Sequence, residues 1–480
     1  MGAKSCGDYR KPMKSYKIQG IEWFVEDEGL IPVLRNVVIP DGSHGRSYVI
    51  ADYNDSQIFI KSFKEKGLPG FIRNRISSRG KREYRLGNFL LSRSIKTAKP
   101  LGYGVSRMGS YIIQKWIEGR SLLTVFKESE HHSELLEMLA VFLKILKMHH
   151  VRHNDLHSDN ILVCDEQLYL IDLHKTRIKA SFTLLDEASN LSHVLVNIYS
   201  YLDSDEKSAF FASYGNTGIQ GLVEQEMDRL ANRWIRKKKE RAFQETSMIV
   251  VRGNRFYITG MESRAVGGLQ RVIKVDRKIR VEQYTDHIRK TYASRHRLER
   301  AWRNHVVLAY MNLSIAPTAF YVERPGDGSM GSITMENLQG KGQELDRYLD
   351  GKYDTMATHE RRRFIARLTD FLLMITRKKI IHKDMKACNV FVFHEGGFML
   401  LDVEDIRFRA LDEESLKRML IQLNTTIPRR VSTGDRIRFF LQFTSPMKLD
   451  KKAIFSAVVR ESMKREIVYE GVDRLKREDW

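Results

Sequence analysis

The sequence predicts an α+β fold with two tandem, two-lobed domains, each a small antiparallel sheet with one helix followed by a mostly helical lobe. Two observations predict it. A His-x-Asp-x4-Asn motif begins at His153 and again at His382. Each motif precedes a short apolar strand, a turn and a second strand that ends in an aspartate, Asp172 or Asp402. The motifs lie 229 residues apart and these aspartates 230. So constant an offset indicates an internal repeat.

Composition sets the outer limits of the prediction. A chain of 480 residues with 42% hydrophobic residues has room for two to four globular domains. No apolar run approaches the ~18 residues that a membrane span needs. Residues 1–17 are polar and basic, unlike a signal peptide. The three cysteines show no metal or disulfide spacing, which favours a reduced, intracellular protein.

The net charge of +21 is the strongest compositional bias. It favours an anionic partner such as a nucleic acid, phospholipid head groups or a phosphorylated saccharide. A merely solvated basic surface is the alternative. Since no RNA-binding or zinc-finger motif is present, no nucleic acid partner is expected.

The repeat divides the chain into three parts. Residues 1–221 form the first predicted domain and residues 248–480 the second. Between them, residues 222–247 are rich in Glu, Arg and Lys and contain no proline, which predicts a helical, basic connector. Its basic run 236–239 is interpreted as a solvated face, with contact to anionic lipid as the alternative. Residues 185–187 recur as 411–413, each before a helical segment.

Upstream of each motif the pattern runs from strands to helices. Alternating apolar residues and Asp-Gly or Asn-Asp turns predict the strands, and apolar stripes at helical spacing predict core-facing helices. In the first copy the expected strands are 35–39, 48–50 and 58–61, with helices at 81–91 and 135–146. In the second copy they are 256–258 and 271–274, with helices at 297–310 and 364–375.

The first copy holds a full set of residues for phosphoryl transfer from ATP. Such transfer depends on charge neutralisation and in-line positioning more than on covalent chemistry. Asp155 is the expected catalytic residue, which orients and deprotonates a hydroxyl acceptor. Asn160 and Asp172 are the expected metal ligands. Lys61 on a strand would hold the nucleotide phosphates, and Glu83 on the next helix would hold that lysine.

The second copy repeats most of this set. Asp384 is the expected catalytic base, and Asn389 and Asp402 are the expected metal ligands. Lys274 is predicted to hold the phosphates, because it ends the strand 271–274. Lys386, two residues after the base, is a candidate for stabilising charge on the transferred phosphoryl group.

One element of the second copy is missing. Aligning residues 82–84 with 300–302 places Ala301 where the helix glutamate belongs. Glu299 would face roughly 200° away round the helix, so it is a poor substitute. The histidine that opens each motif, His153 or His382, is interpreted as structural, bonded to the loop backbone. The glycine-rich segments at 41–45 and 260–268 are not GxGxxG, and neither metal aspartate is followed by Phe-Gly.

These motifs resemble the bacterial lipopolysaccharide core heptose and Kdo kinases, a protein-kinase-like family. In the second copy the resemblance rests on residues 300–304, 315–317, 382–390, 401–403 and 421–439. In the first copy it rests on residues 153–163, 171–173 and 186–211. The chain departs from the family in its tandem arrangement, in Asn154 and in Ala301.

The resemblance implies a phosphotransferase that uses ATP and Mg²⁺ to phosphorylate a sugar hydroxyl of the lipopolysaccharide core. The implied acceptor is the core saccharide of a lipid A glycolipid. The implied location is cytoplasmic and peripheral at the anionic surface of the inner membrane. Two alternatives stay open: a protein kinase or small-molecule phosphotransferase of the same fold, and a pseudokinase scaffold whose second domain is inactive.

Overall fold

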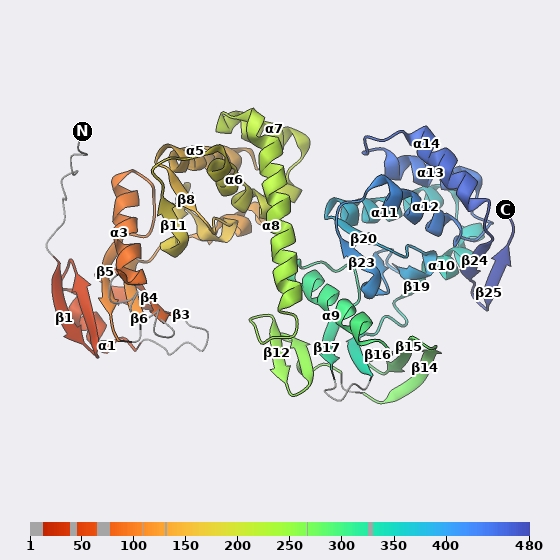
Figure 1. Cartoon of the computed structure of the whole chain (residues 1–480), viewed down its shortest axis with the longest axis horizontal. Coiled ribbons are helices and arrows are strands. Elements are labelled where there is room, and N and C mark those ends of the chain that lie inside the picture. Colours follow the sequence, from red (N-terminus) through yellow and green to blue (C-terminus); the bar gives the residue numbers. More distant parts are fainter. Residues whose placement is uncertain are drawn as a thin grey trace. The chain divides into compact units, whose positions relative to one another are not determined.

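The computed structural model of the chain describes residues 13–38, 46–64, 77–107, 109–129, 132–265, 267–324 and 330–480. The chain forms two compact units, Met1–Ala231 and Asn232–Trp480 (Figure 1). Each contains an antiparallel sheet and a helical lobe, so the predicted α+β class is confirmed. The glycine-rich segment 41–45 lies outside the described residues. None of the described helices is both long and apolar enough to cross a bilayer.

The first unit begins with a six-stranded sheet in the order β1-β2-β5-β6-β4-β3. Strand β4, which carries Lys61, pairs with β3 on one side and β6 on the other. Lys61 therefore lies on an interior strand of the sheet. The predicted strands 48–50 and 58–61 fall within β3 and β4. The elements of this lobe are β1 Lys14–Ile18, β2 Ile21–Val25, α1 Leu30–Asn36, β3 Arg46–Tyr53, β4 Ser56–Lys64, α3 Arg79–Ser92, β5 Pro100–Val105 and β6 Gly109–Lys115.

The predicted strand 35–39 is wrong over its described part. The chain forms helix α1 up to Asn36, and Val38 is exposed. The reason is tertiary packing: Leu30 and Leu34, one helical turn apart, are buried in the core beneath the sheet. This burial outweighs the local preference of consecutive β-branched residues for a strand.

Helix α3 positions Glu83 because it approaches the sheet very closely. The N-cap Ser78 accepts a hydrogen bond from the Lys81 amide. At Gly80 an added Cβ would lie 2.0 Å from the carbonyl oxygen of Tyr111 on β6, so only glycine allows this contact. One turn later, Glu83 and Tyr84 are buried against the sheet. The predicted helix 81–91 therefore exists, and its first turn is fixed against β6.

The second lobe of the first unit surrounds a core in which the stripe Leu135, Leu139, Phe142, Leu143 and Leu146 is buried, as predicted. Two short ladders hold the functional loops: β8 pairs with β11, and β9 with β10. The Asp155 loop joins β8 to β9, and the Asp172 turn joins β10 to β11. The elements are β7 Arg120–Ser121, α4 Leu122–Glu128, α5 Ser133–Met148, β8 Val151–His153, β9 Ile161–Cys164, β10 Gln167–Leu170, β11 Thr176–Ile178, α6 Leu184–Ile198, α7 Ser204–Tyr214 and α8 Gln220–Glu240.

The second unit has a seven-stranded sheet in the order β12-β13-β17-β18-β16-β15-β14. If the edge strand β14 is left out, the remaining six strands follow the same order as the six strands of the first sheet. The long helix, α9 here and α3 in the first unit, also comes at the same point in the chain order. Strand β16 then corresponds to β4, because each is followed by the long helix of its lobe. The elements are β12 Ile249–Arg252, β13 Arg255–Ile258, β14 Leu269–Val275, β15 Ile279–Tyr284, β16 His287–Tyr292, α9 Arg295–Tyr310, β17 Ala319–Glu323 and β18 Gly331–Glu336.

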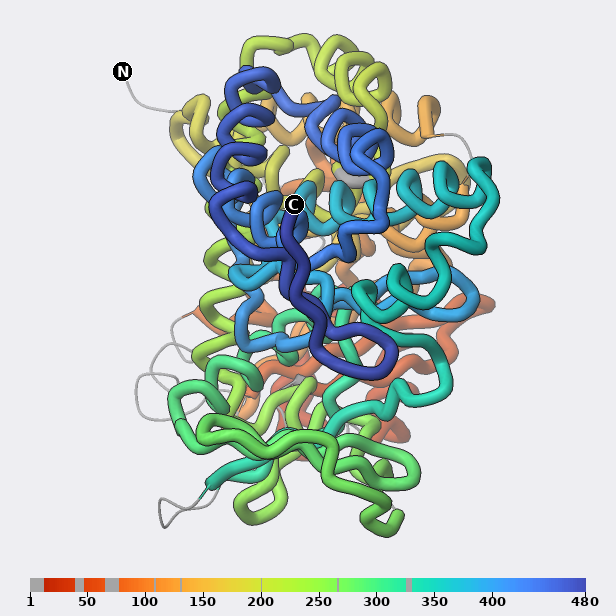
Figure 2. Tube along the Cα trace, turned by 90° about the vertical axis from the view of Figure 1, so that its right-hand side faces the viewer, coloured from red at the N-terminus to blue at the C-terminus, as the bar shows by residue number. Residues whose placement is uncertain are grey.

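The helical lobe of the second unit repeats the two ladders, as β20 with β23 and β21 with β22. A final hairpin, β24 with β25, follows the last helix (Figure 2). The elements are β19 Gly342–Glu344, α10 Leu345–Lys352, α11 Thr358–Arg377, β20 Ile380–His382, β21 Val390–Phe393, β22 Phe398–Leu400, β23 Ile406–Phe408, α12 Glu413–Asn424, α13 Thr433–Thr444, α14 Lys451–Ser462, β24 Ile467–Glu470 and β25 Leu475–Glu478.

The caps of α6 and α12 align the two units beyond the motifs. Thr183 caps α6 by accepting from the Asp186 amide, whereas Asp412 itself caps α12 by accepting from the Ser415 amide. Thr183 and Asp412 are 229 residues apart, the same offset as the motifs. The similarity of residues 185–187 to 411–413 is therefore out of structural register by three residues.

Helix α8 contains most of the predicted connector 222–247. Its first half packs on the core of the first unit through Val223 and Met227, so it is not a free linker. The basic run 236–239 is only partly solvated. Lys238 lies over the ring of Tyr310 at 4.2 Å and Lys239 over Phe408 at 4.6 Å. Burial lowers the pKa of both lysines.

Candidate active sites

In the first unit, Lys61 and Glu83 meet as predicted. The Lys61 Nζ lies 3.7 Å from Glu83 Oε1 and donates a hydrogen bond to Asp172 Oδ1. Lys61 and Glu83 are largely shielded from solvent, with side-chain exposures of 14% and 2%. A strand lysine, a helix carboxylate and the aspartate of the β10–β11 turn thus converge on one point.

Asp172 combines a left-handed backbone conformation with a strongly lowered carboxyl pKa. Its φ of +58° is left-handed, which turns the chain sharply before Leu173. His174 Nδ1 lies 2.8 Å from Asp172 Oδ1. Burial alone would raise the pKa of Asp172, but the hydrogen bond from His174 and the charge of Lys61 outweigh it and hold that pKa far below its usual value. Asp172 is therefore ionised at neutral pH.

His153 connects the two functional loops through backbone contacts. Its Nδ1 accepts a hydrogen bond from the Asp155 amide at 3.1 Å, and its Nε2 lies 3.2 Å from the Asp172 carbonyl oxygen. Burial lowers the pKa of His153 to about 4, so the ring is neutral and Nε2 is the donor. These contacts match the structural interpretation of this histidine.

Asp155 and Asn160 lie on the loop that follows. The Asn160 Nδ2 donates to the Asp155 carbonyl oxygen at 2.8 Å. The Asp155 carboxylate accepts from Lys175 Nζ. Partial burial would raise the pKa of Asp155, but the hydrogen bond and charge of Lys175 lower it, so the group is an anion able to accept a proton.

The second unit has the same loop geometry. Asn389 Nδ2 donates to the Asp384 carbonyl oxygen at 2.7 Å, and His382 Nε2 lies 2.9 Å from the Leu401 carbonyl oxygen. Asp402 has a φ of +50°, close to that of Asp172. The spacing of the motif thus produces the same bond from asparagine to the loop backbone in both units. The histidine contact differs, because His153 Nδ1 accepts from the Asp155 amide and the buried His382 Nδ1 has no partner among the described residues.

Lys274 is not the lysine that meets Asp402, contrary to the prediction. It lies on the solvent-exposed edge strand β14, 3.5 Å from Asp276. Lys290 on β16 takes the place, with its Nζ 2.6 Å from Asp402 Oδ1. The ladder pairs Lys290 with Ile333, as it pairs Lys61 with Ile112 in the first unit. Burial would lower the pKa of Lys290, but interactions with Tyr292, Asp402 and Glu404 raise it above its usual value.

The lysine beside the motif aspartate, Asp155 or Asp384, comes from a different part of the chain in each unit. In the second unit Lys386 Nζ lies 3.0 Å from Asp384 Oδ2, as its place two residues after the base suggested. In the first unit His157 has that sequence position, and Lys175 from the β10–β11 turn holds Asp155 instead. Each base therefore has one lysine partner.

The residue 38 positions after the motif aspartate is His193 in the first unit and Gln422 in the second. Gln422 on α12 donates from Nε2 to Asp384 Oδ1 at 3.1 Å and accepts from the Met385 amide at 2.9 Å. The first unit has His193 there, whose pKa burial lowers to about 4. The Asp384 carboxylate thus has an amide partner on α12 in addition to Lys386.

Sequence reasoning missed Lys175, His174, Lys290 and Glu404. The signal for Lys290 was weak, because the strand His287–Tyr292 is polar and has no apolar run before the lysine. Segment 271–274 has such a run, Val-Ile-Lys, which misled the prediction. Lys175 and Glu404 had a usable signal, since each lies within three residues of a predicted metal aspartate.

The donor sets fit Mg²⁺. Asn160 and Asn389 both direct their amide nitrogen to the loop backbone, which leaves the amide oxygen as the atom able to bind a cation. Asp172 and Asp402 are carboxylates with lowered pKa values, Asp402 because Lys290 outweighs the effect of its burial. Hard oxygen donors of this kind suit Mg²⁺ rather than a thiolate- or imidazole-preferring metal.

Comparison with solved structures gives weak similarities only. Two solved structures are similar at low identity: WaaP in complex with acyl carrier protein, and WbdD in complex with a kinase inhibitor. The WaaP structure is 16% identical over 43% of this chain and 88% of its own, with a TM-score of 0.32. The WbdD structure is 12% identical over 45% of this chain and 48% of its own, with a TM-score of 0.30. Likenesses this weak do not define the fold.

No curated protein sequence matches the chain. A family model does match, over residues 71–213, and this segment contains Glu83, Asp155, Asn160 and Asp172. The resemblance expected from the motifs is thus confirmed for the first copy. Residues 71–213 are similar to the lipopolysaccharide kinase (Kdo/WaaP) family, a family of phosphotransferases.

Proposed function

We propose that the first unit transfers the γ-phosphoryl group of ATP to a sugar hydroxyl of the lipopolysaccharide core, a heptose or Kdo. The observation that carries the proposal is the meeting of Lys61, Glu83 and Asp172, with Asp155 tied to the same point through His153. The choice of a core sugar as acceptor is supported by the family match. The chain as a whole would be a tandem kinase-like protein.

The residues suggest how the step proceeds. The ionised Asp155 carboxylate accepts the proton of the sugar hydroxyl while the hydroxyl oxygen attacks the γ-phosphorus of ATP. The bond between the γ-phosphorus and the bridging oxygen of the β-phosphate breaks, and ADP leaves. Lys61 binds the α- and β-phosphates, and Glu83 keeps Lys61 in place. Mg²⁺, held by Asn160 and Asp172, would neutralise phosphate charge. Lys175, beside Asp155, is placed to neutralise charge on the transferred group.

The proposed setting is the cytoplasmic face of the inner membrane, as a peripheral protein on its anionic surface. The net charge of +21 supports this, since lipid A, core saccharide and inner-leaflet lipids are anionic. Nucleic acid is not proposed as a partner. Co-sedimentation with anionic vesicles, lost at high salt, is the expected behaviour.

The acceptor is tested with the purified chain, γ-labelled ATP and isolated core saccharide that lacks phosphate. Label should appear on the saccharide, and mass spectrometry should show one added phosphate on a heptose or Kdo residue. Label on a co-purified protein and none on the saccharide would favour the protein kinase alternative. Absence of any transfer with every saccharide of the core would refute the proposal.

The role of Lys175 can be tested by removal and rescue. The second unit shows that a lysine two residues after the motif aspartate, Lys386, can also reach that aspartate. We expect Lys175→Met to lower kcat for saccharide phosphorylation about 10²-fold, the usual cost of losing one charge-stabilising donor. Adding His157→Lys should recover at least tenfold, since Lys386 reaches its base from that position. Steady-state kinetics of both variants measure this.

The control for Lys175 is Arg177→Met, which removes an exposed cation two residues further along the chain, on strand β11. Its kcat should stay within twofold of the wild type. If Lys175→Met changes only the KM for the saccharide, the lysine binds the acceptor and does not act on the transferred phosphoryl group.

A further inference from the structure

The lysine of the second unit is held by a carboxylate that does not come from the helix. Lys290 Nζ lies 2.6 Å from Asp402 Oδ1 and 3.0 Å from Glu404 Oε1. Glu404 is two residues beyond Asp402, on the turn before β23. The side chains of Lys290 and Glu404 are 8% and 1% exposed, so this is a buried contact.

Helix α9 has no acid that could do the same. Ala301, which aligns with Glu83, is fully buried. Glu299 forms ion pairs with Arg295 at 3.0 Å, Arg303 at 3.1 Å and Arg324 at 2.8 Å. The loss of the helix carboxylate at Ala301 is therefore real, and the helix does not compensate for it from a neighbouring position.

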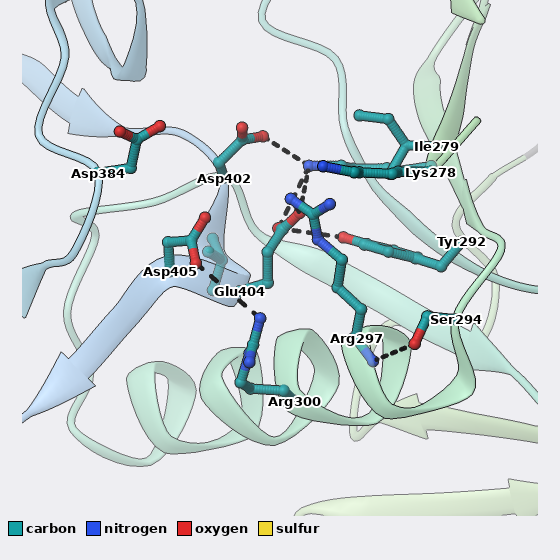
Figure 3. Close-up of polar contacts among 12 residues, drawn as sticks. Lys278, Ile279, Tyr292, Ser294, Arg297, Arg300, Asp384, Asp402, Glu404 and Asp405 are labelled. Atoms are coloured by element: carbon teal, nitrogen blue, oxygen red, sulfur yellow. Dashed lines mark hydrogen bonds and ion pairs between the residues drawn. The ribbon is translucent and has the colours of Figure 1, made fainter. Parts of the chain in front are cut away.

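The acid beside the strand lysine comes from the helix in the first unit and from the turn in the second. In the first unit the helix supplies an acid, Glu83, and the position two after the metal aspartate is His174. In the second unit that position is Glu404, and the helix supplies Arg297, whose guanidinium lies 3.3 Å from Glu404 (Figure 3). The negative charges of Asp402 and Glu404 are then matched by the positive charges of Lys290 and Arg297. Buried charges need such pairing, because an unpaired charge is costly away from water.

Neutral hydrogen-bond donors also fix the turn that carries Glu404. Asn304 Nδ2 on α9 donates to the carbonyl oxygens of Val403 at 2.8 Å and Ile406 at 3.0 Å. The Tyr292 hydroxyl, from the same strand as Lys290, donates to Glu404 at 3.3 Å. Glu404 thus has a defined position against both the sheet and the helix.

We propose that Glu404 replaces the missing helix glutamate as the positioning residue for Lys290, so that the second unit holds a complete site for the phosphates of Mg²⁺-nucleotide. The inference rests on the proposed nucleotide chemistry of this fold. Glu404 keeps Lys290 directed toward Asp402, and Asp402 and Asn389 would be the metal donors of the second unit. The acid lies on the same turn as Asp402, so lysine and metal aspartate stay together without a helix acid.

The test uses the full chain with Lys61→Met and Asp172→Asn, which removes the phosphate and metal contacts of the first unit. Binding of a fluorescent ATP analogue with Mg²⁺ should persist in this background. Adding Glu404→Gln should weaken that binding at least tenfold, while adenosine binding, measured by ligand-observed NMR, should stay within twofold. A purely structural role would weaken both ligands equally, because adenosine lacks the phosphates that Lys290 contacts.

The matched control is Glu299→Gln, which removes a carboxylate of α9 with three cationic partners and no contact to Lys290. It should leave ATP binding within twofold. Glu404→Asp keeps the charge on a shorter side chain and should show a smaller loss. If the Gln variant does not fold, the Asp variant decides: undiminished ATP affinity there overturns the inference.

Two further outcomes separate this inference from the proposed function. If wild type phosphorylates saccharide but the Lys61→Met, Asp172→Asn background binds no nucleotide, the inference is wrong and the function stands. If that background binds ATP in a Glu404-dependent manner but wild type phosphorylates no saccharide, the inference stands and the proposed acceptor is wrong.

Discussion

Asp155→Asn should lower kcat for saccharide phosphorylation by about 10²–10⁴-fold, the range that a positioned general base contributes. The amide keeps the size of the side chain but cannot take the proton of the hydroxyl. The KM for ATP should change little, because Asn160 is held by the backbone carbonyl of residue 155 and not by its side chain. Steady-state kinetics with ATP and core saccharide measure both constants.

Two controls accompany Asp155→Asn. Asp159→Asn changes an exposed acid of the same loop, whose contacts are with Ser121 and His157, and should leave kcat within twofold. Asp384→Asn tests the second unit separately. If Asp155→Asn retains wild-type kcat while Asp384→Asn abolishes transfer, catalysis belongs to the second unit and the assignment made here is wrong.

Lys61→Met should lower kcat/KM for ATP by about 10²–10³-fold, by analogy with the loss of one preorganised charge-stabilising group. The methionine is apolar and cannot bind the α- and β-phosphates. It also removes a cation that keeps Asp172 ionised, so the pKa of Asp172 should rise toward its usual value. Glu83→Gln should have a smaller effect, about tenfold, because Lys61 keeps its contact with Asp172.

Lys115→Met is the control for Lys61→Met, since it removes an exposed lysine from the neighbouring strand β6. Nucleotide titration followed by fluorescence, together with kinetics, separates binding from turnover. Unchanged ATP affinity and unchanged turnover in Lys61→Met would show that the strand lysine has no part in phosphate binding.

Much of each loop was predictable because its chemistry lies within a few residues of chain. The spacing of Asp155 and Asn160 sets the hydrogen bond from the amide to the Asp155 carbonyl, and the same spacing gives the same bond at Asp384. The apolar stripe of 135–146 predicted a buried helix for the same local reason. Strand 35–39 failed because the burial of Leu30 and Leu34 overrode local preference.

The sequence by itself determined the two loops, the aspartate and asparagine that each carries, and the Lys61–Glu83 pair of the first unit. Only the tertiary structure decided which lysine serves the second unit, because strand order and register place Lys290 on the interior strand β16 and Lys274 on the edge. It also decided the charge partners Lys175 and Glu404. A side chain reaches its partner through space, so the same charge can come from different positions along the chain.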